Sequence, residues 1–199
     1  MVFSGDDDYF FPRSLDNCVD FLETNQDFTS AHGFGSYLRY DENIGESTIS
    51  GRYNISEYQG NSGSERIKML MKNYSVLIFG VLRKETFVNA YKNMELLTNP
   101  MFVELMPVGL ISILGKSKKL NELHLVRGTH ETRYKQPKLK ENLLDPEWFS
   151  SVEIYINTLS EELGRTDGLC ENDAKEIVKQ CFLDYIENVI REIYCKKEV

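Results

Sequence analysis

Hydrophobic and polar positions along this chain follow two periodicities, one typical of helices and one typical of strands. Apolar residues three or four positions apart, such as Leu15, Val19 and Leu22, lie on one face of a helix. Stretches that alternate residue by residue, or that are apolar throughout, favour strands. The pattern predicts helices over 14–24, 65–73, 86–97, 102–114, about 145–163 and 171–195, and strands over 1–4, 31–40, 74–82 and 120–127.

The same pattern predicts how these elements are organised. Residues 41–64 are rich in Gly, Ser, Asn and Glu, and they are expected to form a long surface loop or an irregular hairpin. Residues 1–140 read as an α/β unit with a mixed sheet. Residues 141–199 read as a helical extension, expected to fold as a helical pair against that sheet, with the first helix stopping at Gly164.

Composition narrows the class of protein. The 199 residues are 41% hydrophobic, which is enough to bury a core. A net charge of −8 argues against a dedicated nucleic-acid binder. No apolar run reaches the length of a transmembrane segment. The four cysteines form no Cys-x-x-Cys pair, so reduced thiols and a cytoplasmic location are expected.

An acidic triplet, Asp6-Asp7-Asp8, follows the first predicted strand. Adjacent carboxylates repel one another, so they need solvent or a cation. On an extended backbone Asp6 and Asp8 point to the same side, where their oxygens suit a hard divalent ion. The alternative is a solvated acidic turn in which Asp8 caps the following segment. An EF-hand is excluded because Phe11 stands where that loop needs glycine.

The triplet belongs to a longer resemblance. Family-2-like glycosyltransferases of the GT-A fold contain a segment similar to SGDDDYFFPRSLDNCVDFLETNQDFTSAHG, which begins with their D-x-D motif. Weaker similarity continues in YSVLIFGVLRKE, NPMFVELMPVGLISILGK and LHLVRGTHETR, so the resemblance covers about residues 3–134. It implies an α/β fold: a partial GT-A sheet with helices, followed by the C-terminal helical pair.

The activity that this resemblance implies is transfer of a sugar from a nucleotide-sugar donor, with inversion and with Mn²⁺ or Mg²⁺ as cofactor. The acceptor is left open between a glycan, a lipid and a small molecule. A complete GT-A domain carries its first nucleotide-holding βαβ units ahead of this motif, whereas this chain starts at the motif. We therefore expect the C-terminal part of a catalytic domain, which can be inactive alone. One of its strands, near 1–4 or 31–40, should expose an edge or an apolar face, which favours self-association. The alternative is a non-enzymatic binding or adaptor protein built on a truncated transferase scaffold.

The resemblance also implies roles for the carboxylates. Asp8 would bind the metal directly, Asp6 would bind the donor ribose or a metal-bound water, and Asp7 would assist in donor binding. Glu104, in an otherwise apolar stretch, would be the general base that takes the proton of the acceptor hydroxyl. The alternative for Glu104 is an exposed glutamate on the edge of a helix.

Further roles fall on four residues. His130 would be a third metal ligand, or an ordinary surface histidine. Arg127 would contact the diphosphate, or form a structural salt bridge. His32 and Gly33 would let the backbone approach the transferred sugar closely, or would form a plain turn.

Overall fold

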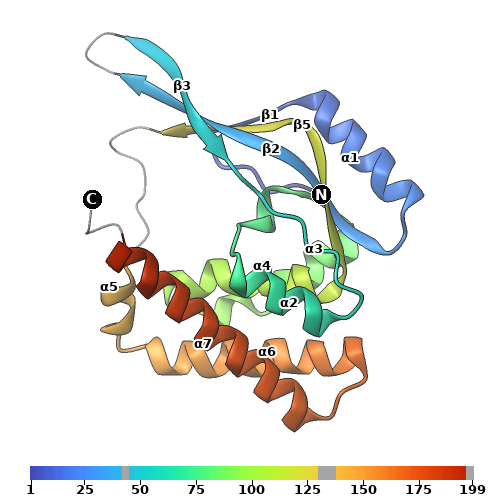
Figure 1. Ribbon diagram of the computed structural model, residues 1–199, viewed down its shortest axis with the longest axis vertical. Helices are drawn as coiled ribbons and strands as arrows, with labels where there is room; N and C mark the ends of the chain where they lie inside the picture. Colours follow the sequence, from blue (N-terminus) through green and yellow to red (C-terminus); the bar gives the residue numbers. More distant parts are fainter. Residues whose placement is uncertain (42–44, 130–137, 196–199) are drawn as a thin grey trace.

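The computed structural model describes residues 1–41, 45–129 and 138–195, and within them a mixed sheet is covered by helices (Figure 1). The strands follow the order β1-β5-β2-β3, and β4 also pairs with β2. Their bounds are β1 Asp8–Phe10, β2 Phe28–Asp41, β3 Glu46–Tyr53, β4 Val81–Leu82 and β5 Lys116–Thr129. The predicted α/β class is thereby confirmed.

The two long strands in the middle of the sheet, β2 and β5, are parallel, and the other pairs are antiparallel. Gly33 lies at a register shift in the pairing of β2 with β5. A Cβ atom there would sit 2.2 Å from the carbonyl oxygen of Glu122, so only glycine allows this approach. Leu125 and Val126 of β5 are buried, and they anchor the sheet in the core.

The helices form successive layers. Figure 1 shows the sheet above α2 and α4, with α6 and α7 below them. Helix α1 packs against β2 and β5, α6 packs on α4 and α7, and α7 also packs on α2. The bounds are α1 Pro12–Thr24, α2 Gly63–Lys72, α3 Lys84–Ala90, α4 Pro100–Leu114, α5 Leu139–Leu143, α6 Trp148–Asp167 and α7 Glu171–Cys195, with 3₁₀ turns η1 Leu77–Phe79 and η2 Met94–Leu96.

One large core joins these layers. The ring of Phe102, on α4, lies 5.2 Å from that of Trp148, 5.5 Å from Tyr155 and 5.7 Å from Phe182, measured between ring centroids. These partners come from α6 and α7, and the same cluster reaches Leu125 in the sheet. The core thus draws on both sides of residue 140, while the division into two domains stays a prediction.

Helix α6 is tied to α2 by one carboxylate. Asp167, the last residue of α6, accepts hydrogen bonds from the backbone N–H of Gly63 at 2.7 Å and of Ser64 at 2.8 Å. These amides belong to the first turn of α2, where backbone donors have no partner within the helix. Arg66 continues the connection by donating to the carbonyls of Ser112 and Ile113, at the end of α4.

Several predicted boundaries are wrong. Residues 1–4 form no strand, so the acidic triplet leads into β1 instead of leaving a strand. The apolar run 74–82 is a 3₁₀ turn and a two-residue strand, because Leu77 and Phe79 point into the core as a turn. The helix predicted over 86–97 stops early, since Asn93 adopts a left-handed φ of 63°. Helix α1 begins at Pro12, two residues before the predicted start, so Ser14 lies inside it.

Other differences have equally simple causes. Residues 46–53 pair with β2, so the irregular-hairpin alternative for 41–64 is the one confirmed in the described residues. Helix α6 runs through Gly164, where an added Cβ would lie 3.3 Å from the carbonyl oxygen of Leu169, and it ends at Gly168 with φ 68°. The helical pair rests on α4 and α2 more than on the sheet. Strand β2 has partners on both sides, so an exposed edge at 31–40 is also wrong.

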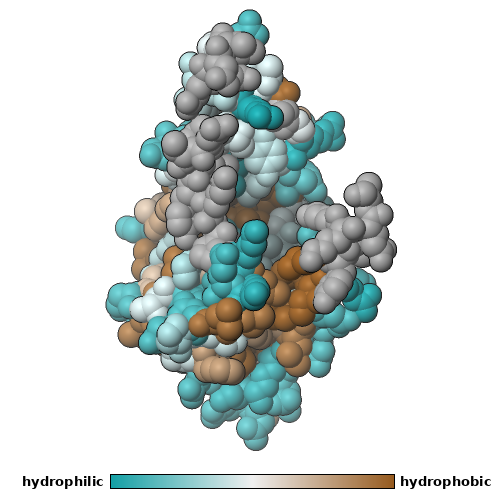
Figure 2. All heavy atoms as spheres, turned by 90° about the vertical axis from the view of Figure 1, so that its left-hand side faces the viewer, coloured by the Kyte–Doolittle hydropathy of each residue, from teal (hydrophilic) through white to brown (hydrophobic). Residues whose placement is uncertain are grey.

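Apolar surface gathers on the face that carries α5. Figure 2 shows this face, with brown atoms over the helical half of the molecule and a hollow below the β2–β3 hairpin. Leu144, next to α5, is 73% exposed and Phe149, at the start of α6, is 82% exposed. Such exposure suits association, and self-association stays a prediction.

Candidate functional site

The last aspartate of the triplet is held in a buried ion pair. Asp8 opens β1 directly opposite Arg127 of β5, so the antiparallel register sets the two side chains side by side. Arg127 Nε donates to Asp8 Oδ1 at 3.1 Å, and the exposed fractions are 1% for the Asp8 side chain and 17% for that of Arg127. The second carboxylate oxygen, Oδ2, accepts from the backbone N–H of Gly5 at 3.2 Å.

The guanidinium of Arg127 lies against two aromatic rings. It is 4.3 Å from the centroid of Phe79 and 5.0 Å from that of Tyr53. Cation–π contact holds a guanidinium most firmly where water is excluded. Burial raises the pKa of the Tyr53 phenol, and the positive charge of Arg127 opposes that rise. The ion pair therefore packs against two uncharged aromatic rings, those of Phe79 and Tyr53.

The other two aspartates differ in their surroundings. Asp6 is exposed, whereas Asp7 is half-buried and its backbone oxygen accepts from Gly128 N–H at 2.8 Å. Within the described residues, no three His, Cys, Asp or Glu side chains are grouped as a metal site would require. Both carboxylate oxygens of Asp8 already have protein partners, Arg127 and Gly5, so metal binding by Asp6 and Asp8 stays a prediction. His130, the predicted third ligand, lies outside the described residues.

Glu104 lies on α4 at the wall of a pocket of about 610 Å³. Its side chain is half-buried and not exposed, and Tyr74 donates its hydroxyl to Glu104 Oε1 at 2.9 Å. The remaining lining is mostly apolar and is formed by Phe3, Ile78, Tyr91, Met94, Thr98, Pro100, Val103 and Pro107. A carboxylate at an apolar wall is an arrangement suited to proton transfer, and the role of Glu104 as a base stays a prediction.

The charge of Glu104 affects the pKa of several buried tyrosines. Burial, and after it Glu104, raises the pKa of Tyr74 well above its usual value and that of Tyr91 to about 12. The same two causes act on Tyr185. Glu104 also adds to the rise in the pKa of Tyr53, the ring beneath Arg127. These tyrosines therefore stay protonated and available as hydrogen-bond donors at neutral pH.

One aromatic wall connects the Glu104 pocket with the Asp8–Arg127 pair. Phe3 lines the pocket, and its ring centroid lies 6.4 Å from that of Phe79. Phe79 in turn lies under the guanidinium of Arg127. The structure thus pairs Asp8 with Arg127 and links this pair to the pocket of Glu104 through Phe79 and Phe3.

His32 and Gly33 lie inside the sheet and do not form a turn. His32 is fully buried in β2, where Nδ1 donates to the carbonyl of Gly33 at 3.0 Å, while Nε2 is buried with no hydrogen-bond partner among the described residues. Burial lowers the pKa of His32 to about 4. Close packing against Glu122 explains the glycine, and a contact with donor sugar stays a prediction.

A residue that sequence reasoning missed, His124, positions the turn beneath Arg127. Its buried Nε2 lies 3.0 Å from the carbonyl of Phe79, so Nε2 carries the proton, and Nδ1 accepts from the Ser14 hydroxyl at 2.9 Å. Burial lowers the pKa of His124 and keeps it neutral. The available signal was a histidine between two leucines in a predicted strand, which suggests a buried polar partner.

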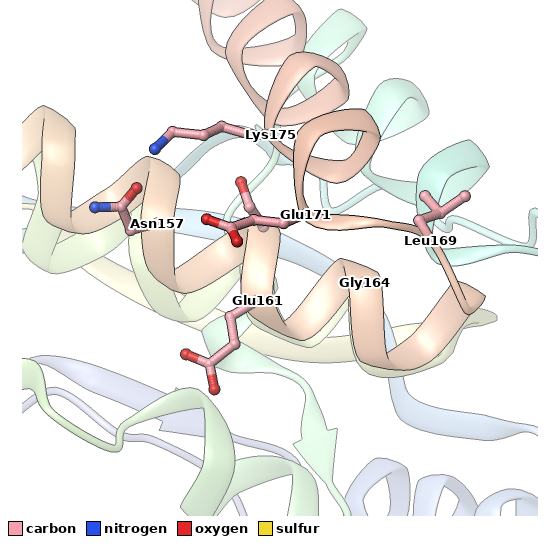
Figure 3. A pocket seen from close by; sticks show the side chains of 7 residues that line it. Asn157, Glu161, Gly164, Leu169, Glu171 and Lys175 are labelled. Atoms are coloured by element: carbon pink, nitrogen blue, oxygen red, sulfur yellow. The ribbon is translucent and has the colours of Figure 1, made fainter.

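A second pocket, of about 510 Å³, lies between α6 and α7 (Figure 3). It is polar, and Figure 3 shows Asn157, Glu171 and Lys175 on one side of the helices, with Glu161 pointing away from them. None of the site residues predicted from the sequence lines it. The candidate site is therefore the Asp8–Glu104 region.

Comparison with known proteins leaves the family open. Neither the models of protein families nor the curated proteins include a match to this chain. The helices in the described part of the chain include none with the length and apolar character needed to cross a bilayer.

Proposed function

We propose that this chain is part of a metal-dependent, inverting glycosyltransferase that uses a nucleotide-sugar donor. The donor diphosphate would lie at the Asp8–Arg127 pair, and the acceptor would lie in the Glu104 pocket. The observation that supports this proposal is the contact between the rings of Phe3, which lines the Glu104 pocket, and Phe79, which lies under the guanidinium of Arg127. A transferase needs its leaving-group site and its base to flank one reacting carbon.

Each group has a defined task in the transfer. Glu104 takes the proton of the acceptor hydroxyl as its oxygen forms a bond to the anomeric carbon. The bond from that carbon to the diphosphate breaks on the opposite face, and the nucleoside diphosphate leaves with the electron pair. Arg127 offers a cation to the departing oxygens. Mn²⁺ or Mg²⁺, held by Asp6 and Asp8, would supply further charge compensation there.

A second function is favoured by one specific observation. Both oxygens of the Asp8 carboxylate already have protein partners, Arg127 and Gly5. A motif satisfied in this way suits a binding protein that keeps the pocket and performs no transfer. The two functions differ in whether Asp8 exchanges Arg127 for an ion.

A paramagnetic ion tests that exchange directly. Mn²⁺ added with a nucleoside diphosphate should broaden the amide signals of Gly5, which donates to Asp8, and of Gly128 in β5, which donates to Asp7. Asp8→Asn keeps the shape of the side chain and should abolish the broadening. Asp27→Asn, which removes an exposed surface carboxylate paired with Lys116, serves as the control and should leave it intact.

The outcome separates the two functions. Broadening that depends on Asp8, together with release of nucleoside diphosphate from a nucleotide sugar, supports the transferase. Amide signals of Gly5 and Gly128 that stay sharp at saturating Mn²⁺ and diphosphate would refute it and leave the binding protein. A spectrum of Asp8→Asn that overlays elsewhere with the wild type shows that the variant is folded.

A further inference from the structure

We infer that the exposed surface formed by α5 and the start of α6 is a docking surface for a second copy of this chain, which gives a dimer with two-fold symmetry. This surface, residues 138–153, is called the α5–α6 face below. The inference goes beyond the proposed transferase activity and does not depend on it, because no residue of the α5–α6 face lines the Glu104 pocket or belongs to the acidic triplet.

Three apolar side chains form the centre of the α5–α6 face. Leu143 and Leu144, at the end of α5, are 45% and 73% exposed, and Phe149, in the first turn of α6, is 82% exposed. Figure 1 shows α5 beside the start of α6 at one end of the helical layers, and Figure 2 shows apolar surface on that side of the molecule. Large apolar side chains that are neighbours and are exposed to this degree are typical of interaction sites.

Charged side chains of opposite sign lie on the two sides of this apolar centre. Lys140 precedes the centre, Glu153 follows it, and both are exposed. Lys140 is separated from Leu143 and Leu144 by three and four positions, and Glu153 is separated from Phe149 by four. These spacings place each charge on the same helical face as its apolar neighbours. The α5–α6 face therefore changes from basic through apolar to acidic along its length.

Other carboxylates of this segment accept hydrogen bonds from nearby groups of the same chain. Glu141 accepts from a backbone N–H at the start of α5 at 2.9 Å. Asp145 accepts from the side-chain amide of Asn99 at 2.8 Å. Glu147 accepts from the hydroxyl of Ser150 at 3.0 Å. The charges at the two ends of the α5–α6 face are instead placed at the surface, where a partner can reach them.

The order of these charges makes the α5–α6 face complementary to itself. In a two-fold dimer, every contact of one residue with another is repeated with the two copies exchanged. An axis near Leu144 aligns the two copies in opposite directions, so that Lys140 of each copy faces Glu153 of the other while the apolar centres meet. Opposite charges around an apolar centre favour one register and one partner. A second copy supplies this complementary order by symmetry alone.

The size of the α5–α6 face determines how strong the dimer should be. A standard interface uses about 20–30 residues on each side. Residues 138–153 are fewer, so we expect a weak dimer that forms at micromolar to millimolar concentration and dissociates on dilution. The carboxylates near the apolar centre disfavour an anionic lipid surface as the partner.

Sedimentation velocity measures the dimer directly. Between about 2 µM and about 500 µM protein, in about 50 mM salt, the sedimentation coefficient of the wild type should rise toward that of a dimer. Phe149→Ser removes the most exposed apolar side chain of the α5–α6 face, so the dimer dissociation constant should rise by about tenfold or more while Tm is unchanged. Ile49→Ser is the matched control, because it removes a side chain that is 65% exposed on β3, and it should leave the dissociation constant unchanged.

An exchange of charges tests whether the partner is a second copy. Lys140→Glu and Glu153→Lys each place like charges opposite one another in a homodimer, so each variant alone should raise the dissociation constant by about tenfold or more. In an equimolar mixture of the two variants, both opposite-charge pairs are restored, and the mixture should dimerise like the wild type. Dimerisation of the mixture also shows that both variants are folded.

Any of three results would overturn the inference. The first is a wild-type chain that stays monomeric at about 500 µM, a concentration at which even a small interface should associate. The second is association that Phe149→Ser leaves unchanged. The third is a mixture of Lys140→Glu and Glu153→Lys that associates no better than either variant alone. None of these measurements uses Mn²⁺ or nucleotide, so they leave the test of the transferase separate.

Discussion

At the scale of single residues, two buried histidines show opposite ways of accommodating a neutral ring. His124 is satisfied on both nitrogens, by Ser14 and by the carbonyl of Phe79. His32 has one satisfied nitrogen, and its Nε2 is buried with no hydrogen-bond partner in the described part of the chain. Protonation would therefore place an unpaired charge inside the sheet at His32.

The stability of the protein should consequently fall in mild acid. The pKa of His32 is about 4 in the folded protein and about 6.5 when unfolded, so the unfolded chain binds the proton more readily between these values. Between pH 7 and pH 5 we expect His32 to lower the free energy of unfolding by about 2 kcal/mol. Urea denaturation at both pH values measures this loss.

The variant His32→Gln isolates the contribution, because glutamine does not titrate. Its free energy of unfolding should decline less between pH 7 and pH 5 than that of the wild type. Equal declines in the two proteins would assign the acid sensitivity to other groups and would contradict a contribution from His32.

At the scale of elements, the sequence predicts best what is periodic and local. Helices α1, α2, α4 and α7 appear close to their predicted bounds, because a one-sided apolar stripe depends only on spacing along the chain. The run 74–82 fails because continuous apolar residues are equally suited to a buried strand and to a turn within the core. Gly33 is misleading for a different reason, since it allows close packing of β2 against β5 and forms no turn.

The sequence predicts individual residues of the candidate site but not how they pair. The acidic triplet and Glu104 could be selected from their residue types and the family resemblance. The pairing of Asp8 with Arg127 depends on the β1–β5 register, and that of Glu104 with Tyr74 depends on how α4 packs. Local composition indicates neither of these two contacts, and only the structure shows them.

Gly33 provides a sharp test of the central strand pairing. Gly33→Ala would place a methyl group 2.2 Å from a backbone oxygen of β5, which cannot rotate away as a side chain could. We expect a loss of about 3 kcal/mol or more in the free energy of unfolding, the range of the severe single substitutions. Thermal and urea unfolding measure it, and a variant as stable as the wild type would mean that β2 and β5 lie farther apart than described.

The Asp167 connection between α6 and α2 is a second test at this scale. Asp167→Ala leaves the amides of Gly63 and Ser64 without their acceptor and should lower the free energy of unfolding by about 1–2 kcal/mol. Glu161→Ala on the same helix removes an exposed pair with Arg165 and should cost less than about 0.5 kcal/mol. Similar losses in the two variants would contradict a specific cap.

At the scale of the whole molecule, the helical layers and the sheet depend on one core. Rings from α4, α6 and α7 surround Phe102, and the same cluster extends to Leu125 of β5. The outer helices α6 and α7 cover apolar faces of α4 and α2 that would otherwise meet water. A core shared in this way favours unfolding as a single unit.

Two spectroscopic probes at opposite ends of this core test that expectation. Trp148 is the single tryptophan and reports on the α4–α6–α7 contact by fluorescence, while the ring of His124 reports on the sheet by NMR. Their urea midpoints should coincide. Loss of the Trp148 signal at a clearly lower urea concentration would show that the helical extension unfolds independently.

The parallel pairing of β2 with β5 has a consequence for synthesis on the ribosome. Lys116 pairs with Phe28, so one edge of β2 stays unpaired until most of the chain has been translated and β5 has emerged from the ribosome. Until then the nascent chain presents an unpaired edge of a long strand, the kind of surface that recruits other chains. The β2–β3 hairpin can form early and cover the other edge. Production yield should therefore respond more to translation speed between residues 54 and 116 than to codon choice elsewhere.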